Sequence, residues 1–192
     1  MQDLHRRGWC DGTGGNFSVV TDREPLHLLM APSGVNKGNV STSDLIVVNA
    51  DGEVVKGNGR ASAETLMHLR IVDQCGAGAV LHTHSVNATW LSRQFLEQGS
   101  LCIEGWEMLK GLEGVDTHAT SIELPIINND QNLTTLSETA SQRLNRAPHG
   151  LLVSGHGLYA WGKDLQQAHR HTEIIEFLLE LAWRQTLVNH HS

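Results

Sequence analysis

The stretch Val80-Leu81-His82-Thr83-His84-Ser85 places two imidazoles one residue apart within an apolar run. On a β-strand, residues i and i+2 point to the same face of the sheet, so His82 and His84 are expected to lie side by side. A histidine on a buried face needs a hydrogen-bond partner or a metal ion, because an unpaired buried polar group is costly. The spacing suits two ligands of one metal ion, although two ordinary core or surface histidines would give the same pattern.

Composition is that of an ordinary globular protein. The chain has 192 residues, 40% of them hydrophobic and 18% charged, which predicts one domain over residues 1–192. A formal net charge of -7 without a dense Lys/Arg patch argues against nucleic acid as a partner. No apolar run approaches the roughly 18 residues of a membrane helix, and the start MQDLHRRGWCDG has no secretory segment. The 3 cysteines fit no metal or disulfide spacing, so a cytoplasmic protein is expected.

The remaining pattern predicts an α/β domain with more strands than simple alternation of strands and helices would give. Turn residues and hydrophobic periodicity indicate where the elements lie. Strands are expected at residues 17–21, 27–31, 45–49, 53–55, 79–84, 119–127, 150–154 and 157–161, and helices at 62–74, 134–145 and 164–188. Residues 106–110 are expected to form a short connection, and any helix before the glycines at 12–15 is expected to be short.

A third imidazole adds to the first two. His156 lies between Gly155 and Gly157 at a strand break, where a side chain can reach into a cleft. With His82 and His84 it would complete a three-ligand site with an open position, as in catalytic zinc sites. Taken alone, the GHG segment is more typical of a turn histidine without a partner. The other histidines considered are interpreted as surface or packing residues: His68, His118, His169, His171, His190 and His191.

Two carboxylates are candidates for proton transfer. Glu107 follows Trp106 and precedes an apolar pair, a position that allows partial burial and a raised pKa useful for proton transfer, although a lone glutamate of this kind is more often a surface residue. Glu64 falls in the first turn of a predicted helix, where the helix dipole stabilises a carboxylate even without a catalytic role. On residue pattern alone, both glutamates therefore remain open candidates.

Two loops could hold an anion. Residues 12–16 and 33–37 offer backbone amides, hydroxyls and one lysine, a mixture that suits a phosphate group. Neither loop matches the P-loop pattern or the dinucleotide-binding pattern. Because glycine-rich turns are common, the loops alone do not establish a phosphate site.

Five segments occur in a fixed order: GTGGNFS at residues 12–18, APSGVNK at 31–37, ASAET at 61–65, AVLHTHS at 79–85 and SGHGLYAWG at 154–162. In this order they resemble the class II aldolase/adducin family, and the resemblance covers residues 6 to 185. It implies a three-layer αβα fold with a mainly antiparallel central sheet, and homotetramers with sites near subunit contacts. It also implies one divalent metal ion per subunit, usually zinc, bound by His82, His84 and His156. The family's longer first helix implies that this chain starts within it.

The resemblance also implies roles for the other candidates. Family aldolases have two serines before the glutamate where this chain has Ser62-Ala63, so Glu64 is only a secondary candidate as metal ligand or base. Glu107 opens the segment EMLKG, which resembles the one carrying the acid/base carboxylate in a dehydratase branch of the family. The substrate phosphate would be held by Gly15, Asn16, Ser33, Gly34 and Ser62, with Lys37 as a further candidate.

The chain is therefore expected to be a metal-dependent hydro-lyase that removes water from a phosphorylated ketose. Zinc would polarise the C2 carbonyl and the C3 hydroxyl, and Glu107 would take the C3 proton and return it to the departing C4 hydroxyl. The nearest alternative is a sugar-phosphate aldolase or pentulose-phosphate epimerase on the same scaffold. A second alternative is an adducin-like interaction module without a metal, against which the intact histidine set argues.

Overall fold

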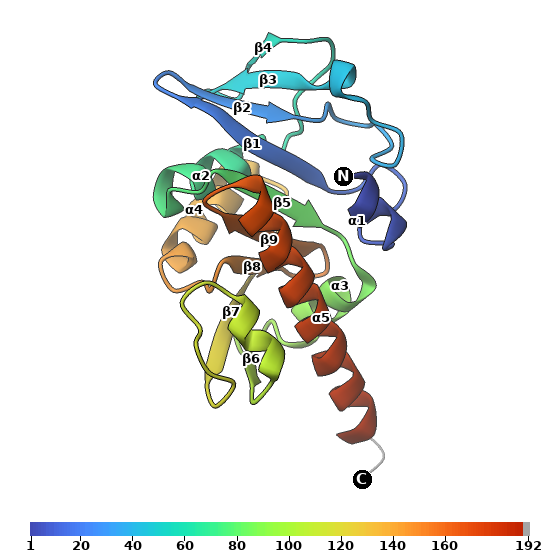
Figure 1. Ribbon diagram of the computed structural model, residues 1–192, viewed down its shortest axis with the longest axis vertical. Coiled ribbons are helices and arrows are strands. Elements are labelled where there is room, and N and C mark those ends of the chain that lie inside the picture. Colours follow the sequence, from blue (N-terminus) through green and yellow to red (C-terminus); the bar gives the residue numbers. More distant parts are fainter. Residues whose placement is uncertain (190–192) are drawn as a thin grey trace.

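The computed structural model describes residues 1–189. Their strands form one mixed sheet in the order β4-β3-β2-β1-β5-β9-β8-β7-β6 (Figure 1). Neighbouring strands are antiparallel except for the parallel pair β7 and β8. The prediction of a mainly antiparallel sheet in an α/β fold is confirmed. The strands are β1 (Asn16–Arg23), β2 (Leu26–Met30), β3 (Ile46–Asn49), β4 (Val54–Lys56), β5 (Ala79–Thr83), β6 (Ser100–Glu104), β7 (Ser121–Ile127), β8 (Gly150–Val153) and β9 (Gly157–Gly162).

Helices pack against both faces of this sheet. The helical elements are α1 (Gln2–Arg6), η1 (Thr42–Asp44), α2 (Thr65–Cys75), α3 (Val86–Gln94), η2 (Glu107–Gly111), α4 (Leu133–Leu144) and α5 (Leu165–Asn189). On β9, Tyr159 and Trp161 join the core formed with α2 and α4, whereas Leu158 and Ala160 join the core formed with α3 and α5. This alternation follows from the two-residue period of a strand, and it makes the central strands apolar on both faces.

Two elements were absent from the sequence-based prediction. Helix α3 has a narrow apolar face, with Ala88 and Leu91 buried, and its start is fixed by the Ser85 hydroxyl, which accepts a hydrogen bond from the Ala88 amide at 3.0 Å. Strand β6 is a short edge strand whose buried residues, Leu101 and Ile103, are too few to give a clear period. Residues 106–110, expected as a plain connection, belong mostly to the 3-10 helix η2.

The centre of the sheet brings the sequence motifs together. Strand β5 lies between β1 and β9, and its residue His82 pairs with Asn16 on one side and with Tyr159 on the other. His84, expected at the end of the strand, lies just beyond it in the turn toward α3. Three motifs that are far apart in the sequence thus meet at one end of β5.

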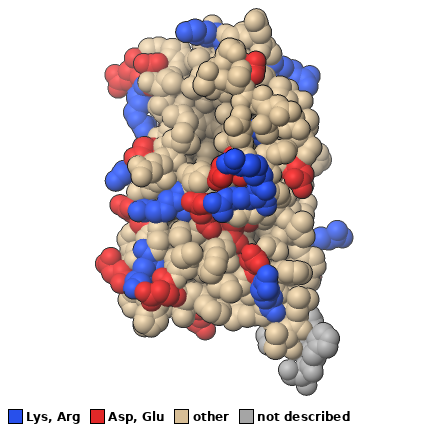
Figure 2. Space-filling view, turned by 45° about the vertical axis from the view of Figure 1, so that its right-hand side comes forward, with Lys and Arg blue, Asp and Glu red and all other residues tan. Residues whose placement is uncertain are grey.

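The surface of the described residues carries charges of both signs. On the face drawn in Figure 2, basic and acidic side chains are interspersed along a band across the molecule. Within residues 1–189, no helix is both long and apolar enough to span a bilayer.

Candidate active site

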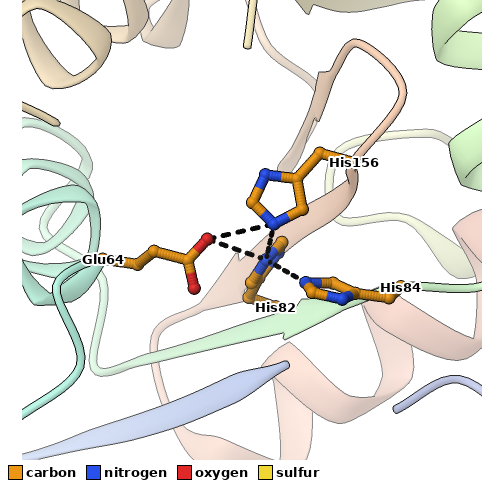
Figure 3. Close-up of side chains that lie close together, drawn as sticks. All are labelled: Glu64, His82, His84 and His156. Carbon is orange, nitrogen blue, oxygen red and sulfur yellow. Dashed lines mark hydrogen bonds and ion pairs between the residues drawn. The ribbon is translucent and has the colours of Figure 1, made fainter. Parts of the chain in front are cut away.

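Three histidine rings and one carboxylate converge beside the central strands (Figure 3). His82 lies on β5, His84 follows that strand, His156 lies in the turn between β8 and β9, and Glu64 is the N-cap of α2. The Nε2 atom of His82 is 2.8 Å from Nε2 of His84 and 3.3 Å from Nε2 of His156. The fold therefore brings together the three histidines that the sequence selected.

Hydrogen bonding fixes which nitrogen of His82 faces the cluster. Its Nδ1 lies 2.9 Å from the Leu158 carbonyl oxygen, which can only accept, so Nδ1 carries the proton and Nε2 keeps a lone pair. The ring of Tyr159 stacks on the His82 ring, with centroids 3.9 Å apart and planes 9° apart. His82 is fully buried and is held in one orientation by these two neighbours. Such support is typical of a histidine that binds a metal ion.

The donor set fits a divalent cation. A tetrahedral ion with bonds of roughly 2.1 Å separates its ligand atoms by roughly 3.4 Å. In the cluster, the distances from His82 Nε2 to the other two imidazoles, and from Glu64 Oε1 to His82 and His156, range from 2.8 to 3.5 Å. Imidazole lone pairs that face one another this closely repel unless a cation lies among them. Burial, followed by the proximity of the His82 and His156 rings, lowers the pKa of His84 to about 3, which leaves that ring neutral and able to bind a metal.

Glu64 belongs to the centre of the cluster. Its Oε1 atom lies 3.1 Å from Nε2 of His156 and 3.5 Å from Nε2 of His82. Burial would raise the pKa of Glu64, but the adjacent imidazoles of His156 and His82 outweigh burial and hold the pKa well below its usual range. The Asn16 amide donates to Oε2 at 2.5 Å and so orients the carboxylate. Glu64, only a secondary candidate in the sequence, is thus placed to act as a ligand or as a base.

A cavity of about 230 Å³ opens beside the cluster. Glu64 and His84 form part of its wall. All of the residues expected to hold a phosphate group line it: Gly15, Asn16, Ser33, Gly34, Lys37 and Ser62. The two loops therefore share one cavity with Glu64 and His84 of the cluster.

Lys37 differs from a free phosphate-binding lysine. Its side chain is buried, and Nζ donates hydrogen bonds to the carbonyl oxygens of Thr13 at 3.0 Å and Val35 at 3.1 Å. Burial lowers the pKa of Lys37. In this arrangement Lys37 ties the two cavity loops together, and its charge adds to the field of the cavity from behind them.

Glycines near the histidines are required by close backbone approaches. A Cβ atom at Gly15, whose φ is +71°, would lie 2.6 Å from the His82 carbonyl oxygen. A Cβ atom at Gly157 would lie 2.0 Å from the Thr83 carbonyl oxygen. The GTGGN and GHG motifs therefore have a steric reason that the sequence alone did not reveal, because it depends on strand pairing.

Helix α3 supports the turn that carries His156. The Thr89 hydroxyl donates to the His156 carbonyl oxygen at 2.9 Å, and the Ser92 hydroxyl accepts from the Gly155 amide at 3.0 Å. Sequence reasoning missed these residues together with the helix, since hydroxyls on a short helix give no recognisable signal. They fix the third imidazole relative to the other two.

Glu107 lies outside this cavity, and the hypothesis that it is partly buried with a raised pKa is wrong for the described chain. Its side chain is 71% exposed and pairs with Lys110 and with His118, the latter at 3.4 Å. The hydrogen bond from Lys110 lowers the pKa of Glu107. The physical reason is that Leu109 is the residue of η2 that is buried, so Glu107 faces outward.

Within residues 1–189, the other histidines considered in the sequence lie apart from the cluster of His82, His84 and His156. His68 is buried and bonds the Ser18 hydroxyl at 2.7 Å, and buried His171 donates to the Trp161 carbonyl oxygen at 2.7 Å. His118 is exposed, and His169 is partly exposed beside carboxylates that also pair with an arginine. His190 and His191 lie outside the described residues.

Comparisons with known proteins agree with this geometry. The model of the class II aldolase and adducin N-terminal domain matches residues 1–183, so the chain belongs to the class II aldolase and adducin family, as its motifs predicted. Methylthioribulose-1-phosphate dehydratase from Serratia proteamaculans (strain 568) is 41% identical over 190 residues, covering 96% of this chain and 91% of the relative. The enzyme of the same name from Stenotrophomonas maltophilia (strain R551-3) is 40% identical, covering 93% and 84%. The solved structure of L-fuculose-1-phosphate aldolase from Thermus thermophilus is similar with a TM-score of 0.78 and 25% identity, covering 98% and 92%.

Proposed function

We propose that this chain catalyses the dehydration of 5-methylthioribulose 1-phosphate to 2,3-diketo-5-methylthiopentyl 1-phosphate, a step of methionine salvage. The observation that carries the proposal is the cluster of His82, His84, His156 and Glu64, which meets the cavity lined by the candidate phosphate-binding residues through Glu64 and His84. Identities of 41% and 40% to dehydratases of this substrate support the same reaction. We also infer that residues 1–192 act as one domain of three layers, because helices pack on both faces of a single sheet.

The proposed cofactor is one zinc ion per subunit, bound by His82, His84 and His156. Bound there, zinc would supply Lewis-acid polarisation of the substrate's C2 carbonyl and C3 hydroxyl. Asn16 keeps the Glu64 carboxylate turned toward the histidines. Gly15 and Ser62, with the turn at Ser33 and Gly34, line the same cavity and would orient the phosphate group there.

A carboxylate must carry the proton. Removal of the C3 proton and departure of the C4 hydroxyl, which takes up a proton to leave as water, give an enol that ketonises to the 2,3-diketone. We propose Glu107 for this role, acting in the cavity of a neighbouring subunit, because it is exposed and lies outside its own cavity. Sites near subunit contacts are what the family resemblance implies.

Sharing of sites between subunits can be tested by mixing two inactive variants. Glu107→Gln cannot move a proton and His82→Ala cannot complete the metal site, so each homotetramer should be inactive. If Glu107 acts in trans, tetramers assembled from both chains after unfolding and refolding should recover roughly a quarter of the wild-type turnover, because chance pairs an intact histidine set with an intact Glu107 at that frequency. If Glu107 acts within its own chain, every site keeps one defect and mixing restores nothing.

A sugar-phosphate aldolase is the second candidate, and the position of Glu64 favours it. An aldolase would break the C3–C4 bond with a carboxylate beside the metal, and Glu64 lies 3.1 Å from Nε2 of His156. The discriminating experiment incubates the purified protein with methylthioribulose 1-phosphate and other ketose phosphates and identifies the products. A diketone phosphate supports the dehydratase, whereas dihydroxyacetone phosphate with an aldehyde supports the aldolase. Turnover by Glu107→Gln together with inactivity of Glu64→Gln would also favour the aldolase.

We further propose that the protein is a cytoplasmic homotetramer with no nucleic-acid or membrane partner. Exposed apolar side chains on three neighbouring elements support subunit contacts. Val86 and Trp90 of α3, Met108 of η2 and Phe177 of α5 are 76%, 37%, 37% and 44% exposed. The net charge of -7 is unfavourable for binding nucleic acid.

A further inference from the structure

The residue between His82 and His84, at the end of β5, has a buried carboxyl group as its partner. Thr83 lies between His82 and His84, and strand alternation directs its side chain to the opposite face of the sheet. There its hydroxyl donates a hydrogen bond of 2.6 Å to Oε1 of Glu176, a residue of α5. Thr83 is completely buried and Glu176 is 2% exposed. One side of the strand end therefore carries the imidazoles, and the other side is tied to a helix.

Packing alone does not explain a glutamate at this position. Its neighbours along α5, Ile175, Leu178 and Leu179, are fully buried in an apolar core. Burying a carboxyl group among them is costly. Besides Thr83, only the nearby Ser85 hydroxyl lowers the pKa of Glu176 among the described residues. Leucine or methionine would pack here at lower cost, so the carboxyl group is kept for the contact that it makes.

The contact between Thr83 and Glu176 lies where β5 stops pairing with its neighbouring strands. The pairing of β5 with β9 ends at Thr83 and Leu158, and the pairing with β1 ends one residue earlier, at His82 and Asn16. Beyond Thr83 the backbone turns into α3, with the His84 amide bonded to the Trp9 carbonyl oxygen at 2.7 Å. A rotation of the chain at Thr83 would move both imidazoles at once, because they flank it on either side.

We propose that Glu176 is a positioning residue of the metal centre, which acts through Thr83 to fix the relative orientation of His82 and His84. The proposal rests on the metal site of the proposed function and adds a residue on the opposite face of the sheet to it. Neighbours of metal ligands commonly change metal affinity tenfold to a hundredfold when removed. A comparable loss is expected here.

The experiment compares four variants in the full chain. Glu176→Met and Thr83→Val remove the hydrogen bond while keeping the side-chain size, and Glu176→Gln and Thr83→Ser keep an acceptor and a donor as matched controls. Zinc dissociation constants are measured by competition with a chromophoric chelator. The absorption spectrum of the cobalt-substituted protein reports the ligand geometry, and thermal unfolding of the metal-free protein reports the fold.

We expect Glu176→Met and Thr83→Val to weaken zinc binding tenfold to a hundredfold and to alter the cobalt spectrum, with both controls within about threefold of wild type. The double variant Glu176→Met/Thr83→Val should bind zinc about as strongly as the weaker-binding of the two single variants, because both substitutions remove the same hydrogen bond. Folded Thr83→Val with wild-type zinc affinity and an unchanged cobalt spectrum would overturn the proposal, even if Glu176→Met fails to fold. Wild-type protein that binds no metal would instead refute the metal site and, with it, this inference.

Discussion

The two glycines that flank His156 offer a matched test of how the metal-binding site is built. Gly157→Ala adds a Cβ atom 2.0 Å from the Thr83 carbonyl oxygen and 3.2 Å from Cδ2 of His84. Gly155 has a φ of +62°, and a Cβ atom there would have no neighbour within 4 Å. One substitution therefore tests steric contact between β5 and β9, and the other tests backbone conformation alone.

The expected magnitudes follow from these distances. A Cβ atom essentially never lies closer than 3.0 Å to such a neighbour, so β5 and β9 must separate by about 1 Å beside His84 in Gly157→Ala. Overpacking of this kind costs roughly 1–3 kcal/mol, and weakening buried backbone hydrogen bonds adds roughly 1–3 kcal/mol. We expect a loss of roughly 2–6 kcal/mol in the free energy of unfolding, or roughly 4–24 °C in Tm. Gly155→Ala should lose only roughly 1–2 kcal/mol, the cost of a left-handed alanine.

Chemical denaturation and metal analysis measure both effects. Gly157→Ala should also retain less zinc than wild type after dialysis, because His84 follows the displaced carbonyl group of Thr83. Gly155→Ala should keep its zinc. If Gly157→Ala is as stable as Gly155→Ala and holds a full complement of metal, then the close approach of β5 and β9 does not determine the site.

Three further predictions concern the metal, the assembly and a buried carboxyl group. Wild-type protein should contain about one zinc ion per chain, and the His82→Ala/His84→Ala variant should remain folded but contain none; full zinc occupancy of that variant would refute the ligand assignment. Light scattering should report a homotetramer at micromolar concentration, and a fully active monomer would contradict both the assembly and the shared site. Burial raises the pKa of Glu176 from 4.5 to about 7 in the folded chain. Between these two values the folded state keeps a proton that the unfolded state loses. The stabilisation from this bound proton is full below pH 4.5 and is lost as the pH rises through 7. Wild type should therefore lose up to roughly 3 kcal/mol of unfolding free energy relative to Glu176→Gln when the pH is raised from 5 to 8. A difference between the two proteins that does not change with pH would rule out this titration.

The sequence by itself determined the family, the class of fold and the three imidazoles. Alternation along β5 was enough to place His82 and His84 on one face, because the two-residue period of a strand is a local property. The glycines around His156 marked a turn, because the backbone freedom of glycine is also a local property. The loops at residues 12–16 and 33–37 were recognised by composition, and they line the cavity beside the histidines.

Only the tertiary structure decided which other groups belong to the site. Glu64 became central because the pairing of β1 with β5 sets Asn16 opposite His82, and Asn16 then orients the carboxylate. Glu107 was assigned from its motif, but the burial of Leu109 turns it toward solvent, a consequence of packing that no local pattern encodes. Glu176 gave no signal, because the helix that carries it also contains Glu173 and Glu180 and its pattern does not distinguish the three. Contacts across strands and between layers join residues that are distant in the sequence, so their energies appear only once the chain has folded.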